Sequence, residues 1–129
     1  MSALVRRVAV GAGIVFAFFG ASKLALPSVS GPQFEAWGYP AWFVFVVAPS
    51  EILAGALLLV LRTRRLGALL GLVLMTGALF THARVPTVGL LPLLPLAILL
   101  FAACAFVAWR LRPAAHASVA SVGPPLGAR

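Results

Sequence analysis

The chain has 129 residues, of which 63% are hydrophobic and only 9% are charged. An ordinary soluble domain carries about 25% charged residues, so this composition excludes a typical soluble globular protein. The formal net charge of +8 would suit a nucleic-acid partner, but the basic residues do not form a patch with interleaved polar groups, so we exclude that class as well. We expect an integral membrane protein whose main partner is the lipid bilayer.

Four apolar segments are long enough, or nearly long enough, to cross a bilayer core as helices, which takes about 20 residues each. Polar and apolar residues do not alternate along them, as they would along the strands of a membrane barrel, and a helix satisfies its own backbone hydrogen bonds in lipid. The predicted fold class is therefore all-α, a four-helix transmembrane bundle that forms a single domain over residues 1–112. The predicted helices cover about residues 8–26, 41–61, 66–83 and 88–109.

Basic residues cluster at three places: before the first predicted helix, between the second and the third, and after the fourth. Because arginine and lysine favour the cytoplasmic side of a membrane, this arrangement predicts a multi-pass protein of the inner (plasma) membrane with both termini in the cytoplasm. Arg84 is the single exception, since it follows the third helix on the predicted outer side. The clustered residues are Arg6, Arg7, Arg62, Arg64, Arg65, Arg110 and Arg112.

The two ends of the chain need separate interpretation. Residues 1–25 also resemble a secretory signal peptide, with Arg6 and Arg7 ahead of an apolar run, but Lys23 interrupts the region where cleavage would occur, and we favour a membrane helix. Residues 113–129 are rich in proline, glycine, alanine and serine and lack apolar periodicity. They predict a disordered cytoplasmic tail.

The predicted outer connection at residues 27–40 is rich in aromatic side chains. Aromatic rings favour the head-group level of a bilayer, so we interpret Trp37 and Tyr39, together with Trp42 just after the connection, as an interfacial belt that seats it on the membrane. The alternative is that these side chains form a lid over a pocket.

The fourth segment differs from the others because Pro92 and Pro95 lie in its outer half. Proline inside a helix removes a backbone donor and kinks the helix, whereas proline in the first turn is tolerated. The sequence does not choose between a kinked helix and one that begins at these prolines.

Glu51 is one of only two acidic residues, and it lies ten positions after Ala41, or about 15 Å along a helix. That depth is near the middle of a core of about 30 Å, where a charged residue costs about 2.5–3.5 kcal/mol. Residues three and four positions away are neighbours on a helix, so Ala48, Ala54 and Gly55 share its face, and small residues mark helix contacts in lipid. We expect Glu51 to point into the bundle and to be protonated, paired or hydrated.

Three residues lie at a depth from which they could reach Glu51. Lys23 is four residues before Pro27 and could bend toward Glu51 or extend to the head groups, and His82 and Arg84 end the third predicted helix. One interpretation is a buried Lys23–Glu51 ion pair that fixes helix register. The other is a polar site on an outward-facing cavity, where Glu51 exchanges a proton or binds a polar head group. We expect Arg84 to be an interfacial anchor.

The sequence shows no autonomous redox or hydrolytic centre, so whether the protein is an enzyme stays open. Cys104 is the only cysteine, and we expect it to be a small core residue. His82 and His116 lie in a helix end and in the tail, so they cannot hold one haem, and no cluster has metal-ligand spacing. We find no phosphate loop and no nucleophile motif. No cofactor is indicated, although a quinone or a lipid could occupy the polar site.

Four short stretches carry a family resemblance: FGASKLA (19–25), FEAWGYPAW (34–42), PSEILAGALLLVLR (49–62) and LMTGALFTH (74–82). Together they resemble the DoxX-like family of small four-helix integral membrane proteins. The resemblance implies Lys23, Glu51 and His82 as the characteristic polar positions. For some relatives it also implies a link to membrane oxidoreductase systems and to assemblies that handle oxidative or thiol stress.

We therefore weigh three functions. The one that the resemblance favours is an accessory or anchoring subunit of a membrane redox or stress-response system, with a soluble oxidoreductase as its partner. The second is a stand-alone protein that binds a lipophilic small molecule or isomerises it by proton transfer. The third is a structural scaffold, a homo-oligomer or a small proton-coupled carrier.

Overall fold

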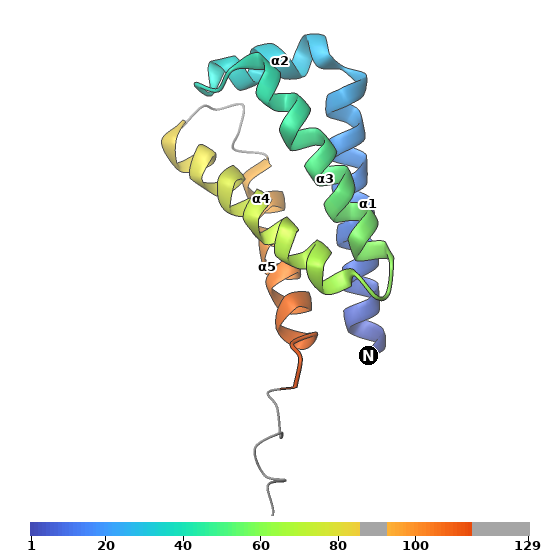
Figure 1. Ribbon diagram of the computed structural model, residues 1–129. Coiled ribbons are helices and arrows are strands. Elements are labelled where there is room, and N and C mark those ends of the chain that lie inside the picture. The colour runs from blue at the N-terminus through green and yellow to red at the C-terminus, as the bar shows by residue number, and fades with distance from the viewer. Residues whose placement is uncertain (86–92, 115–129) are drawn as a thin grey trace, which may run out of the picture.

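The computed structural model describes residues 1–85 and 93–114, and within this part of the chain all regular structure is helical (Figure 1). This confirms the all-α prediction. The helices are α1 (Ala3–Ala25), α2 (Pro27–Ala36), α3 (Val44–Leu59), α4 (Arg64–Arg84) and α5 (Leu94–Arg110), and a short 3₁₀ turn, η1 (Ala41–Phe43), leads into α3.

Three of these elements are long and apolar enough to cross a membrane: α1, η1 together with α3, and α4. The helix α5 is apolar as well but has 17 residues, which corresponds to about 25 Å. The protein therefore has three to four apolar helices that are compatible with a membrane bundle. The predicted fourth helix began at residue 88, and residues 86–92 lie outside the described part of the chain, as do residues 115–129 of the predicted tail.

The helix α5 begins at Leu94 with Pro95 in its first turn. A proline there loses no helical hydrogen bond, because the first N–H groups of a helix have no partner within it. For Pro95 the structure thus favours a helix start over a kink, whereas Pro92 lies outside the described residues.

The helices α1 and α3 pack antiparallel with their backbones in close contact. A side-chain carbon added at Gly55 would lie 2.6 Å from the Gly13 carbonyl oxygen, and one added at Gly20 would lie 2.6 Å from the Ala48 carbonyl oxygen. Both distances are too short for any side chain, so glycine is what allows this approach. Small residues of this kind drive helix association in lipid, as the sequence predicted for this face of α3.

The helix α4 packs against both α3 and α5. A carbon added at Gly67 would lie 2.6 Å from the Leu58 backbone nitrogen, and one added at Gly71 would lie 2.7 Å from the Cys104 sulfur and 3.1 Å from the Phe16 ring. Gly71 is thus the point where α1, α4 and α5 meet. Cys104 is fully buried there, which confirms the prediction of a small core residue.

The connection at residues 27–40 contains a helix that the sequence analysis did not predict. Figure 1 shows α2 lying across one end of the bundle, which we call the α2 end. Pro27 opens α2 at a position that suits proline, and Gly38 follows its end with a φ of +84°, a conformation that glycine adopts readily. The sequence of α2 gives no helical signal because its serines, glycine and prolines lack apolar periodicity.

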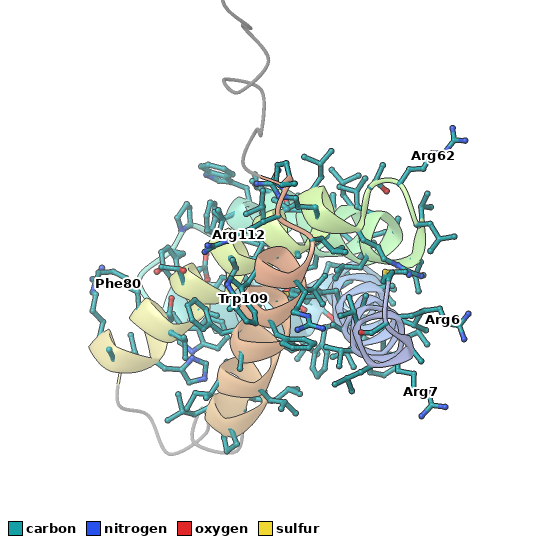
Figure 2. The ribbon with its side chains drawn as sticks, turned by 90° about the horizontal axis from the view of Figure 1, so that it is seen from below. Arg6, Arg7, Arg62, Phe80, Trp109 and Arg112 are labelled. Atoms are coloured by element: carbon teal, nitrogen blue, oxygen red, sulfur yellow. The ribbon has the colours of Figure 1, made fainter. Side chains whose placement is uncertain are left out.

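The opposite end of the bundle, which we call the arginine end, contains the start of α1 and the end of α5. Figure 2 shows Arg6, Arg7 and Arg62 extending away from the ribbon at this end. Arg64 differs, because it is only 3% exposed and its Nε donates a hydrogen bond of 2.9 Å to the Leu58 carbonyl oxygen. Arg64 thus satisfies a carbonyl at the end of α3, a contact that the sequence analysis did not predict.

Candidate functional site

Lys23 of α1 and Glu51 of α3 form an ion pair between the two most closely packed helices. The Lys23 Nζ lies 2.6 Å from Glu51 Oε2 and 2.9 Å from Oε1. The side chain of Glu51 is 8% exposed and that of Lys23 is 22% exposed. The ion pair that the sequence analysis gave as one of two interpretations is therefore present, and its buried member is the carboxylate.

The position of the pair follows from the way α1 and α3 cross. Gly20 packs against α3 between Ala48 and Ile52, so Glu51 lies at about the level of Gly20, and Lys23 lies three residues nearer the α2 end. Three residues of helix correspond to about 4.5 Å, a distance that the long Lys23 side chain spans. Lys23 therefore bends inward to Glu51 and does not extend to the head-group level, which was the alternative.

His82 of α4 lines the same cavity as Lys23 and Glu51, but it does not bond to them. Its Nδ1 lies 2.7 Å from the Ala78 carbonyl oxygen, one helical turn earlier. Its Nε2 is buried and has no hydrogen-bond partner among the residues that the structure describes. The structure thus brings the three predicted polar residues to one cavity, with His82 separate from the ion pair.

Tyr39 and Thr81 form a second polar contact, which the sequence analysis did not predict. The Tyr39 hydroxyl lies 2.8 Å from Thr81 Oγ1, and Thr81 Oγ1 donates a hydrogen bond of 2.9 Å to the Gly77 carbonyl oxygen. This contact joins the segment after α2 to the end of α4. Thr81 gave no signal because a threonine in an apolar helix commonly bonds its own backbone.

A cavity of about 580 Å³ lies between all five helices and contains these polar groups. Its walls are mostly apolar, and Ser22, Ser30 and Gln33 add further polar atoms from α1 and α2. Its phenylalanine, tryptophan and tyrosine side chains come from α1, α2, η1 and the loop between α2 and η1: Phe16, Phe19, Phe34, Trp37, Tyr39 and Phe43. Small-molecule sites have this volume, with an apolar lining and few polar groups.

The sequence analysis interpreted Trp37, Tyr39 and Trp42 either as an interfacial belt or as a lid over a pocket, and the structure places them differently from one another. Trp37 and Tyr39 line the cavity and pack around the buried ring of Phe34. Trp42 is 62% exposed and does not line the cavity. Arg84 is also exposed, with its guanidinium 5.6 Å from the Phe80 ring centre. Trp37 and Tyr39 thus belong to the cavity, whereas Trp42 and Arg84 lie on the exposed surface, where their role as interfacial anchors stays a prediction.

Comparison with known proteins gives a family for the chain. The sequence model of the DoxX-like family matches residues 8–107. The chain belongs to the DoxX-like family. The match confirms the resemblance seen in the sequence, and its range includes Lys23, Glu51 and His82. No curated protein and no solved structure gives a significant match to the chain.

Nothing in the described part of this DoxX-like protein resembles a metal centre, since residues 1–85 and 93–114 contain no group of three histidine, cysteine or acidic side chains that could hold a metal ion. The chemistry that the site offers is that of its side chains: one ion pair, one imidazole and several hydroxyl groups on an apolar cavity. Such a site is suited to binding an amphiphilic molecule.

Proposed function

We propose that this DoxX-like protein is a four-span protein of the inner (plasma) membrane that binds a lipophilic small molecule with a polar head group in the cavity at its α2 end. The observation that carries this proposal is the cavity itself, because it combines an apolar lining with the Lys23–Glu51 pair and His82. The lining would hold the body of the molecule, and the polar residues would hold its head group. A quinone or a lipid belongs to this class.

The orientation in the membrane is part of the proposal. The start of α1 and the end of α5 lie at the arginine end, and six of the seven clustered arginines are exposed. Basic residues favour the cytoplasm, so the arginine end would face the cytoplasm with both termini, and the cavity would lie in the outer half of the bilayer. A reporter fused after Arg65 should be found on the cytoplasmic side, and its appearance outside would contradict this orientation.

We further propose that the protein acts as an accessory subunit of a membrane redox or stress-response system, presenting its bound molecule to an oxidoreductase partner. The support for this role is membership of the DoxX-like family together with a cavity suited to a lipophilic molecule. Native mass spectrometry after extraction in mild detergent should detect a partner oxidoreductase. A homo-oligomer that carries neither a partner nor a small molecule would instead indicate a scaffold.

Binding in the cavity is tested by filling it. Ala78 of α4 lines the cavity, so Ala78→Phe places a ring in the space where the ligand would lie. Ala83 is exposed on the same helix, so Ala83→Phe is the matched control. We expect native mass spectra to show a bound small molecule on the wild-type protein and on the control but not on Ala78→Phe. Equal occupancy of all three would place the molecule elsewhere and contradict the proposal.

A further inference from the structure

The hydrogen bond made by His82 fixes what its other nitrogen can do. A carbonyl oxygen only accepts hydrogen bonds, so the Nδ1 that lies 2.7 Å from the Ala78 oxygen must carry a proton. In the neutral imidazole, the second nitrogen is then an acceptor. Nε2 therefore presents a buried lone pair that no described residue satisfies.

The charges on the cavity balance without His82. Lys23 and Glu51 are its only other ionisable side chains near neutral pH among the described residues, and they are paired with each other. His82 therefore faces no free carboxylate on the cavity wall, because Glu51 is paired with Lys23. A charged head group would likewise find no free charge of opposite sign on the cavity wall, so we expect the head group of the ligand to be neutral.

The Tyr39–Thr81 contact adds a second acceptor. Thr81 has one hydroxyl proton and gives it to the Gly77 carbonyl oxygen, so Tyr39 must donate its own proton to Thr81. The Tyr39 oxygen can then only accept a further hydrogen bond. The side chains of Ser30 and Gln33 on α2 can either donate or accept a hydrogen bond, so they do not restrict the choice of ligand. Tyr39 and His82 can only accept one, because each already donates its proton to a group on α4.

We propose that the molecule taken by this cavity is a lipophilic phenol, whose hydroxyl donates to His82 Nε2 while its ring packs among the aromatic side chains of the walls. This inference rests on the proposed function, since it specifies the ligand of the same cavity. A head group that offers only carbonyl oxygens would leave the His82 acceptor unpaired, which is unfavourable in a buried site. The side chains that shield Nε2 from water must shift slightly to admit the hydroxyl.

The test compares para-octylphenol with its methyl ether, in which a methyl group replaces the hydroxyl hydrogen and the donor is lost. The chain has three tryptophans, of which Trp42 and Trp109 are exposed and lie off the cavity. The double variant Trp42→Phe/Trp109→Phe therefore makes the fluorescence of Trp37 a reporter of the cavity. In nanodiscs, with both ligands expressed per mole of lipid, the phenol should bind about tenfold more tightly, the effect of one hydrogen bond.

Substitutions at His82 in the same background identify the acceptor. His82→Phe keeps a ring but removes the lone pair, so the phenol should lose about tenfold in affinity while the ether is unaffected. His82→Gln retains an oxygen near the position of Nε2 and should keep part of the preference. Equal affinity of wild-type protein for both ligands would overturn the phenol inference and leave the proposed function standing, whereas saturable binding of neither would contradict the proposed function itself.

A measurement on unsubstituted His82 keeps the test independent of folding. Nitrogen NMR of histidine-labelled protein should show the His82 Nε2 signal as an unprotonated nitrogen that shifts on addition of the phenol and not of the ether. His116→Gln assigns the signal, because these are the two histidines of the chain. A protonated Nε2, or the same response to both ligands, would overturn the inference.

Discussion

The arginine end and the α2 end of the bundle are built from different residues. At the arginine end, fully buried side chains such as Leu58, Cys104 and Val107 fill the space between helices. Toward the α2 end, α4 diverges from α3 (Figure 1), and the cavity with its polar groups lies there. The two ends thus correspond to the two roles that we assign to the chain: buried side chains that stabilise the fold, and the cavity in which we propose that a ligand binds.

The packing contribution can be tested at Gly55, where we expect the largest effect. Gly55→Ala places a methyl group 2.6 Å from the Gly13 carbonyl oxygen, so α1 and α3 must separate, and the free energy of unfolding should fall by about 3 kcal/mol. Gly11→Ala is the matched control, because nothing lies within 4 Å of its new methyl group, and it should be neutral or slightly stabilising. Denaturant unfolding in detergent would measure both, and an equal loss would contradict the contrast.

The ion pair joins α1 and α3 at the cavity, and its two members should not contribute equally to stability. Lys23→Met leaves the buried Glu51 without a partner, and stability should fall by about 2 kcal/mol. Glu51→Gln should cost less, because the long Lys23 side chain can then extend toward the head groups. The double variant Lys23→Met/Glu51→Leu should recover most of the loss. If Glu51→Gln proves the more costly of the two single variants, the pair is not organised in this way.

Buried Arg64 allows a second test of packing at the arginine end. Arg64→Met keeps an apolar stem but removes the donor to the Leu58 carbonyl oxygen, so we expect a loss of about 1.5 kcal/mol. Arg65 is the neighbouring exposed residue, and Arg65→Met should change stability by less than about 0.5 kcal/mol. Neither variant should alter ligand binding at the α2 end, and a change in binding would show that the two ends are not separate.

The smallest expected effect is at the Tyr39–Thr81 contact. Thr81→Val removes the acceptor of the Tyr39 hydroxyl, and we expect a loss of about 1 kcal/mol in the free energy of unfolding. Thr76→Val is its control, because Thr76 is exposed on the same helix and bonds only the Leu72 carbonyl oxygen. Thermal unfolding of the two variants would reveal whether the contact between Tyr39 and α4 stabilises the protein, and matching midpoints would show that it does not.

Sequence reasoning reached the ion pair as one of two interpretations of Glu51, because a carboxylate in an apolar helix requires a partner and the chain offers few. The sequence also indicated the packing face of α3, since small residues such as Ala48, Ala54 and Gly55 mark helix contacts. The position of His82 was only partly predictable. Its depth in the membrane places it near Lys23 and Glu51, whereas its hydrogen bond to the Ala78 carbonyl oxygen depends on the side-chain rotamer.

Other features had no signal that sequence reasoning could use. The helix α2 lacks apolar periodicity, so its position across the end of the bundle depends on tertiary contacts such as the burial of Phe34. Arg64 resembles its neighbours Arg62 and Arg65 in sequence, and only the fold distinguishes a buried donor from exposed charges. The cavity itself arises from the divergence of α4, which no local pattern encodes.

Photocrosslinking with a lipophilic diazirine probe, followed by mass spectrometry of the labelled residues, tests most directly whether the cavity binds a lipophilic molecule. We predict saturable labelling of cavity residues such as Phe34 and Trp37, which is lost in Ala78→Phe and retained in Ala83→Phe. Labelling confined to exposed residues such as Phe45 and Phe80, rising with probe concentration without saturation, would show that the probe meets only the lipid-facing surface and would contradict the proposal.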